Sequence, residues 1–369
     1  MTSSKFLFTN GVLSQSSDIP SVSTFLETHP GAYTTTRSHN NGACVLFWER
    51  HLRRLCQSIQ ILWSSHPQLL FEAKRFSKES LPYLSTISET WESGIRGLVN
   101  DSMRKALPIA LKEGSEGDEL AITTLVTANL DKLIVSESVR RESLVNVFDV
   151  HIYIVDFVPP MFGIQENGAH LAVVGPGREA ASAKHSNWVR VRTSLEKLKP
   201  PSATDLLLSN DGNRLLEGSV TNFYVVCRKV NDQDDKDGTE GSATDKKESG
   251  DCFEVQTAPV SDGVLPGVIR QLVIEVCLTR GIPFREVAPM WSEHEIWEEA
   301  FITNSLRLLQ HVETVSIPNS WDSLHLKSWK EISWNKKQFE GGPGTITRAI
   351  QSEIMGRANL EGYSFSDDA

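Results

Sequence analysis

Two consecutive prolines, Pro159 and Pro160, divide this chain of 369 residues into two parts. They follow residues 145–158, whose β-branched content predicts a strand. Proline ends such a strand because it has no backbone N–H to donate to a neighbouring strand. A chain of this length is expected to form about two domains. We therefore predict a small N-terminal α/β domain over residues 1–158, a linker over 159–168 and a C-terminal domain over 169–369.

The apolar pattern of the N-terminal part predicts a mixture of strands and helices. Strands are expected over residues 6–13, with a hairpin turn at Asn10-Gly11, over 31–39 and over 120–127. Residues 49–62 predict a helix because their apolar side chains recur every three or four positions. Residues 67–113 are expected to be mostly helical.

The C-terminal part predicts more strands and an insertion. We expect strands over residues 169–174, 222–227 and 252–257, a hairpin over 206–216, and helices over 186–198 and 267–281. The acidic, polar stretch 229–251 holds too little apolar surface to fold by itself, so we predict a disordered insertion between two paired strands. The pattern as a whole indicates the α+β class.

Charge and composition exclude several kinds of partner. The net charge is −10, and the basic residues are dispersed, which argues against nucleic-acid binding. The five cysteines show no CxxC spacing and the ten histidines are scattered, so neither a disulfide framework nor a metal site is predicted. No apolar run reaches the roughly 18 residues of a membrane span, and the N-terminus resembles no targeting peptide, so a cytoplasmic location is expected.

Phosphate-loop, nucleophile-elbow, zinc-protease and dinucleotide signatures are all absent. Four other motifs occur in order: Lys184-His185-Ser186-Asn187, Glu217-Gly218-Ser219-Val220-Thr221-Asn222-Phe223, Leu265-Pro266-Gly267-Val268-Ile269-Arg270 and Phe301-Ile302-Thr303-Asn304-Ser305. They resemble the K-x-x-N, E-G-x-x-x-N-[FI], G-[IV]-x-R and F-[IV]-T-x-[ST] motifs of class IV aminotransferases, the fold type IV pyridoxal-phosphate enzymes. The resemblance implies a larger, β-barrel-like C-terminal domain with helices, pyridoxal 5'-phosphate as cofactor, a small-molecule substrate and a homodimer.

The resemblance makes Lys184 the catalytic residue that holds the cofactor as a Schiff base. A lysine amine must lose a proton before it attacks an aldehyde, and a desolvated pocket lowers its pKa. The same nitrogen can later move the substrate's α-proton as a general base. Taken alone, Lys184 would more commonly be a solvated surface lysine.

The motif that contains Glu217 and Asn222 is assigned to the cofactor ring. Glu217 corresponds to the carboxylate beside the pyridine nitrogen, where it would keep that nitrogen protonated so that the ring accepts electrons. Taken alone, Glu217 would be a strand-end glutamate paired with an arginine. Asn222 belongs to the same cofactor site.

The cofactor phosphate is assigned to two groups of residues. Arg54 lies in a segment that resembles the family's H-[LIM]-x-R-L helix, and its planar guanidinium suits phosphate; the neighbouring Arg53 is the competing candidate. Gly267, Val268 and Ile269 begin a helix whose free N–H groups face an anion. Ser305 is expected to add a hydroxyl.

The threonine-rich segment 33–37 resembles the family strand that lines the substrate side of the cofactor. Tyr33, Thr35 and Arg37 are therefore the candidate substrate contacts. A threonine-rich strand is also good β-sheet material in its own right.

Details of the motifs favour one branch of the family. The aromatic-T-T-x-R strand, the K-H-x-N motif and the apolar Ile269 in place of threonine resemble the branch nearest aminodeoxychorismate lyase and D-amino acid aminotransferase. We predict amino-group transfer on an amino acid or another amino-bearing carboxylate. The main alternative is 4-amino-4-deoxychorismate lyase activity, which releases pyruvate and p-aminobenzoate. A noncatalytic regulatory protein that binds pyridoxal phosphate or a metabolite is a third hypothesis.

Overall fold

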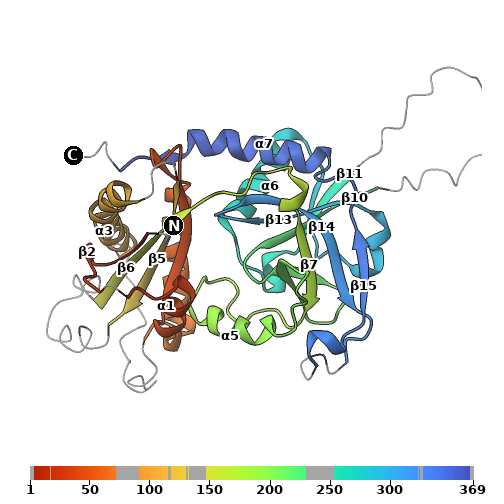
Figure 1. Ribbon diagram of the computed structural model, residues 1–369, viewed down its shortest axis with the longest axis horizontal. Coiled ribbons are helices and arrows are strands. Elements are labelled where there is room, and N and C mark those ends of the chain that lie inside the picture. Colours follow the sequence, from red (N-terminus) through yellow and green to blue (C-terminus); the bar gives the residue numbers. More distant parts are fainter. Residues whose placement is uncertain are drawn as a thin grey trace, which may run out of the picture.

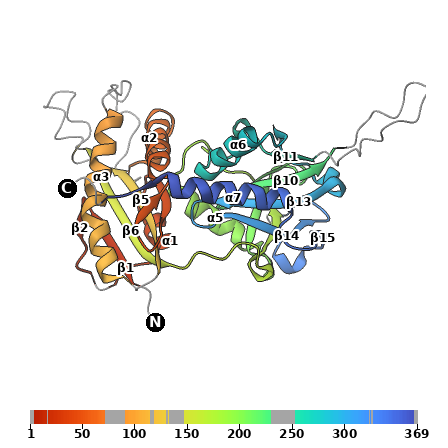
Figure 2. The same ribbon diagram turned by 90° about the horizontal axis from the view of Figure 1, so that it is seen from above.

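The computed structural model describes residues 4–16, 18–71, 91–114, 118–129, 132, 147–229, 253–322, 324 and 327–365. These residues form two halves that lie side by side, each built on its own sheet (Figure 1). Viewed from above, an extended segment joins the halves (Figure 2). The predicted α+β class is confirmed.

The first half is a seven-stranded sheet with helices on both faces. Six of its strands, in chain order, are β1 (Lys5–Thr9), β2 (Val12–Leu13), β3 (Ala32–His39), β4 (Cys44–Leu46), β5 (Glu119–Ala128) and β6 (Phe148–Phe157), and the seventh is β16 (Gly362–Tyr363) from the C-terminal end of the chain. The helices of this half are α1 (Val22–Thr28), α2 (Trp48–Ser65), η1 (Pro67–Leu69) and α3 (Trp91–Glu113). Helices α2 and α3 pack on one face, and α1 packs near Tyr33 and Tyr153 on the other. Successive side chains of a strand point to opposite faces, so Thr34 faces α2 while Tyr33 and Thr35 face away from it.

The predicted elements of this half agree with the structure. The hairpin at Asn10-Gly11 is formed by β1 and β2, and the expected helix over 49–62 lies within α2. Helix α2 buries its apolar stripe, including Leu52, Leu55 and Ile59, against the sheet. Of the helical content expected over 67–113, residues 72–90 lie outside the described residues.

The second half is a nine-stranded sheet that curls into a barrel. Its strands are β7 (Ala169–Val174), β8 (Asp205–Ser209), β9 (Leu215–Gly218), β10 (Asn222–Arg228), β11 (Phe253–Thr257), β12 (Phe284–Glu286), β13 (Trp297–Asn304), β14 (Leu308–Pro318) and β15 (Trp334–Gln338); its helices are α5 (Asn187–Glu196), α6 (Val268–Arg280) and α7 (Thr345–Leu360), with short turns η4 (Gln165–Asn167), η5 (Val260–Asp262), η6 (Trp291–Ile296) and η8 (Trp329–Glu331). Neighbouring strands run from β10 through β13, β14, β7 and β8 to β9. Strand β9 also pairs with β10, through Glu217 and Asn222, and this pairing closes the barrel. Two predicted cofactor residues thus sit where the barrel closes.

The C-terminal end of the chain returns to the first half. Helix α7 leads to β16 (Gly362–Tyr363), which pairs with β4 in the seven-stranded sheet. Strand β16 therefore belongs to the sheet of the first half, although we expected residues 169–369 to form the C-terminal domain. The domain division at 159–168 stays a prediction. The expected strands around residues 229–251 pair as β10 and β11, whereas the insertion after Lys229 lies outside the described residues.

Arg50 on α2 joins the two halves. Its guanidinium contacts Glu275 of α6 at 2.7 Å and Glu361, next to α7, at 2.6 Å. Arg357 of α7 also contacts Glu275, at 2.7 Å. Since Arg54 lies one turn after Arg50, this ion-pair network holds Arg54 in place relative to α6.

No helix among the described residues is both long enough and apolar enough to cross a membrane. Within the same ranges, no group of three or more His, Cys, Asp or Glu side chains is placed to hold a metal ion.

We predict that Arg50→Met lowers the free energy of unfolding by about 1 kcal/mol, because a partly exposed ion-pair network is lost. Urea unfolding at low salt measures the change, and high salt should shrink it. Arg53→Met is the matched control, since Arg53 is exposed on the same helix and should have little effect. Equal stability of the two variants at low salt would contradict the role of Arg50.

Candidate active site

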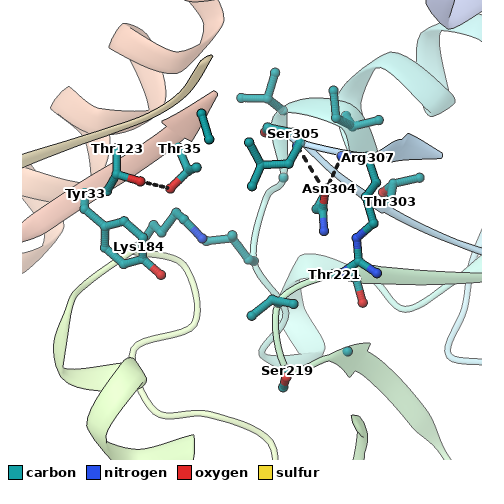
Figure 3. Close-up of a pocket in the computed structure, with 18 of the residues that line it drawn as sticks. Tyr33, Thr35, Thr123, Lys184, Ser219, Thr221, Thr303, Asn304, Ser305 and Arg307 are labelled. Carbon is teal, nitrogen blue, oxygen red and sulfur yellow. Dashed lines mark hydrogen bonds between the residues drawn. The ribbon is translucent and has the colours of Figure 1, made fainter. Parts of the chain in front are cut away.

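A cavity of about 490 Å³ lies between the two halves and is lined by both. Its size falls in the usual range for small-molecule sites, about 300–1,000 Å³. Tyr33, Thr35 and Thr123 line it from the first half, whereas Lys184, the β9–β10 turn, the start of α6 and the β13–β14 turn line it from the second. Figure 3 shows Tyr33 and Lys184 on one side and Thr221 and Arg307 on the other.

Backbone hydrogen bonds fix Lys184 between the halves. The N–H of Tyr33 donates to the Lys184 carbonyl at 2.9 Å, and the N–H of Ser186 donates to the Gly31 carbonyl at 2.9 Å. The N–H of Lys184 donates to Ser58 Oγ on α2 at 3.1 Å. The segment around Lys184 is thus held at the start of β3, while the Lys184 side chain lines the cavity.

The Lys184 amine lies in a desolvated, positively charged environment. Burial lowers the pKa of Lys184 to about 8, and the charges of Arg54 and Arg178 act in the same direction. Its Nζ lies 4.6 Å from the centre of the Tyr33 ring, a cation–π distance. A lowered pKa makes the neutral, nucleophilic amine accessible near neutral pH.

Tyr33 responds to the same charges. Burial, the largest influence, raises the pKa of the Tyr33 hydroxyl, but attraction from Lys184 and Arg192, with a third cavity arginine, outweighs it, so the pKa is lowered. The phenol is therefore a better hydrogen-bond donor to an anion in the cavity than a solvated tyrosine.

Glu217 is buried near the end of β9, and both of its carboxylate oxygens accept hydrogen bonds. Arg178 Nε donates to its Oε1 at 2.8 Å, and the N–H of Leu265 donates to its Oε2 at 2.9 Å. Asn222 Nδ2 donates to Oε2 at 3.3 Å and to the Leu265 carbonyl at 2.9 Å. Burial raises the pKa of Glu217, and the Arg178 charge and the Leu265 N–H oppose that rise. Asn222 and Leu265 thus fix the carboxylate at the barrel closure.

Arg54 reaches the cavity from α2, and Arg53 does not. The Arg54 side chain is buried, with Nη2 donating to Thr34 Oγ1 at 2.7 Å. Burial lowers its pKa to about 10. Its Nε is buried without a hydrogen-bond partner among the described residues. A buried guanidinium whose residue lines a cavity is suited to binding an oxyanion there.

The start of α6 faces the same cavity. Gly267 is the N-cap residue, and Gln271 is the first residue to donate back along the helix, to the Gly267 carbonyl at 3.1 Å. The N–H groups of Val268 and Ile269 have no partner within the helix. A Cβ at Gly267 would meet Asn222 Oδ1 at 2.2 Å, so only glycine allows this close approach. The arrangement is an anion-binding helix N-terminus.

The structure brings together most of the predicted site residues. Arg54, Lys184, Glu217, Asn222, Gly267, Val268, Ile269, Ser305, Tyr33 and Thr35 all line the cavity. Arg37 does not line it. Arg37 is buried two residues farther along β3, where its Nη1 donates to the Ser38 carbonyl at 3.1 Å and Glu119 attracts it.

Three cavity arginines were not predicted from the sequence: Arg178, Arg192 and Arg307. Arg192 follows the buried Trp188 and Val189 by four and three residues, a helical spacing that indicates a shared face. Arg307 follows Ser305 by two residues. Arg178 has no such local signal, because its partner Glu217 is distant in sequence.

The cavity is positively charged although the whole chain is acidic. Its lining includes five cationic side chains, Arg54, Arg178, Lys184, Arg192 and Arg307, and one acid, Glu217. A concave site with this balance favours an anionic ligand.

Comparisons with known proteins agree with this geometry. A family model described as amino-transferase class IV matches residues 99–315, more than half of the chain. No curated protein matches the sequence. The branched-chain aminotransferase of Thermoproteus uzoniensis, solved with norvaline, has a similar structure, with a TM-score of 0.57 and 17% identity over 98% of this chain and 99% of that one.

Two further solved structures share the fold. The Escherichia coli branched-chain amino acid aminotransferase has a TM-score of 0.55 and 17% identity, covering 96% of this chain and 95% of that one. A hypothetical aminotransferase from Mycobacterium tuberculosis, in a PLP-bound form, has a TM-score of 0.56 and 15% identity, covering 95% and 99%. At such identities the likeness shows the fold alone. The family model confirms the family predicted from the four motifs, and the chain therefore belongs to the class IV aminotransferases, enzymes of fold type IV.

Proposed function

We propose that the cavity binds pyridoxal 5'-phosphate and that the enzyme transfers the amino group of an amino-bearing carboxylate. One observation carries the proposal: a single cavity holds a lysine of lowered pKa, Lys184, together with a buried carboxylate, Glu217, and an anion-binding helix start at Gly267. These are the three kinds of group that a phosphorylated pyridine aldehyde requires.

The chain's residues fit this cofactor. The guanidinium of Arg54 and the first N–H groups of α6 supply donors for a phosphate. Ser305 offers a hydroxyl on the same lining. Asn222 belongs to the site through its bonds to Glu217 and the Leu265 carbonyl.

The bound cofactor would supply an aldehyde that joins to amines and a ring that accepts electrons. Lys184 would hold it through Nζ and then act as the base that moves the proton from the substrate's α-carbon. Glu217, stabilised as a carboxylate by Arg178, would hold a proton at the ring nitrogen. Tyr33 and Thr35 would contact the substrate on the side of the first sheet.

Lyase activity on 4-amino-4-deoxychorismate would use the same first proton transfer by Lys184 and differ only afterwards. Supplied with an amino donor, a transaminase converts the cofactor to its amine form, whereas a lyase releases pyruvate from aminodeoxychorismate without an acceptor. The presence of Lys184, Glu217 and Arg54 around one cavity argues against a noncatalytic regulatory protein.

The covalent attachment is tested directly by borohydride reduction. We expect the wild-type protein, supplied with pyridoxal phosphate, to turn yellow and to carry the reduced cofactor on the peptide that contains Lys184. Lys184→Ala should lose the label, whereas Lys197→Ala, which removes an exposed lysine at the end of α5, should keep it. Label on another lysine, or none, refutes the proposal.

The lowered pKa of Lys184 predicts the pH dependence of cofactor capture. Below a pKa of about 8 the amine is mostly charged and cannot attack, and above it the amine is mostly neutral. The rate at which apoprotein becomes yellow should therefore rise with pH up to about 8 and then level off. Acetyl-lysine amide in solution is the control, since its rate should rise toward its ordinary pKa of about 10.4. A protein profile that matches the control would show that Lys184 is not desolvated.

A further inference from the structure

The Thr34 side chain links the strand that holds Lys184 to the helix that carries Arg54. It is completely buried and points toward α2, whereas its neighbours Tyr33 and Thr35 line the cavity. The Tyr33 N–H donates to the Lys184 carbonyl at 2.9 Å, and Arg54 Nη2 donates to Thr34 Oγ1 at 2.7 Å. Two consecutive residues of β3 therefore position the backbone of Lys184 and the guanidinium of Arg54.

His51 reaches the same hydroxyl from α2. Its Nδ1 lies 2.7 Å from Thr34 Oγ1, and its ring is completely buried. Residues three apart in a helix are neighbours on one face, so the His51 ring and the Arg54 guanidinium meet at one oxygen. Thr34 is thus held by two side chains that are one helical turn apart.

Burial and charge keep the His51 ring neutral. Burial lowers the pKa of His51 well below its usual range, and the charges of Arg54 and Lys184 act in the same direction. A protonated ring would place a second buried cation beside Arg54 and would offer no lone pair to Thr34. A neutral ring can accept a hydrogen bond at one of its two nitrogens.

The donors and acceptors around Thr34 Oγ1 favour one arrangement of hydrogens. A guanidinium can only donate, so Thr34 Oγ1 accepts from Arg54 and has its own hydrogen to give to His51 Nδ1. His51 Nε2 has no partner among the described residues in either neutral form of the ring. A proton on Nδ1 would also leave the Thr34 hydrogen without an acceptor, which is costly for a buried hydroxyl. We therefore assign the ring proton to Nε2.

These bonds form a chain in which Arg54 donates to Thr34 and Thr34 donates to His51. A charged donor polarises the hydroxyl and strengthens the next hydrogen bond. The chain also fixes Nη2, which restricts the rotation of a long side chain at the cavity. A guanidinium that is already ordered loses less freedom when it binds an anion.

We propose that His51 is a positioning residue, which accepts the Thr34 hydroxyl hydrogen and so orients the Arg54 guanidinium for the cofactor phosphate. This inference rests on the proposed function. His51 does not line the cavity and would touch neither the cofactor nor the substrate. Its effect should therefore appear only with ligands that carry a phosphate.

The test compares pyridoxine 5'-phosphate with pyridoxine, which have the cofactor ring but no aldehyde and so bind without a bond to Lys184. Calorimetry on the apoprotein should show tighter binding of the phosphate form by the wild type. His51→Leu removes the acceptor and should weaken the phosphate form about 10-fold, the worth of about one hydrogen bond, while pyridoxine affinity stays unchanged. Thr34→Val removes the shared hydroxyl at equal size and should give the same selective loss.

His51→Asn is the conservative variant, because its amide oxygen offers an acceptor near the place of Nδ1. It should bind the phosphate form nearly as tightly as the wild type does. Cys56→Ala is the matched control, since Cys56 is buried in the core on the same helix. This change should lower the free energy of unfolding and leave the ratio of the two affinities unchanged.

Equal weakening of both ligands by His51→Leu and Thr34→Val would show a merely structural role and overturn the proposal. Wild-type affinity for the phosphate form in either variant would overturn it too, as would a loss in His51→Asn equal to that in His51→Leu. Failure of the proposed function is separate, since it would appear as wild-type protein that carries no reduced cofactor on Lys184.

Discussion

The site depends on the short backbone pairing between the start of β3 and the segment around Lys184. Hydrogen bonds of 2.9 Å from Tyr33 to Lys184 and from Ser186 to Gly31 join the two halves at the residue that would do the chemistry. Tyr33 therefore lies against the Lys184 amine because of backbone geometry, and both side chains face one cavity. This pairing therefore fixes the cavity side chains of the first half, such as Tyr33, in position relative to Lys184 from the second half.

Burial and the charges of neighbouring side chains set the protonation states of the groups that line the cavity. Five cationic side chains and one acid line a cavity in a chain whose net charge is −10. Burial and neighbouring cations lower the pKa of Lys184. Burial raises the pKa of Glu217, and the charge of Arg178 opposes that rise and so favours the carboxylate. The same positive field that makes Lys184 nucleophilic attracts the phosphate and carboxylates on which it would act.

Sequence patterns predicted the strands and helices that carry local periodicity. The four motifs, with the segment around Arg54 and the threonine-rich segment 33–37, supplied eleven expected site residues, and ten of them line one cavity. Arg37 shares the strand face of Tyr33 and Thr35, but it lies too far along β3 and bonds to Ser38. Strand alternation fixes the direction of a side chain and not its distance from a site.

Contacts between distant segments were not predictable from periodicity. Arg178 meets Glu217 only because the barrel closes between β9 and β10, and β16 returns to the first sheet after the whole second half has formed. Arg50, which the helical pattern places on a polar face, instead contacts Glu275 and Glu361 from the other half. Arg192 carried a usable local signal, its spacing from Trp188 and Val189.

A crystal structure of the protein with pyridoxal phosphate reduced onto it would show which residues hold each part of the cofactor. We expect a covalent bond at Lys184 Nζ, the phosphate within hydrogen-bond distance of Arg54 and of the Val268 and Ile269 N–H groups, and the ring nitrogen beside Glu217. A phosphate bound instead by Arg192 or Arg307, with the ring nitrogen turned away from Glu217, would contradict that expectation.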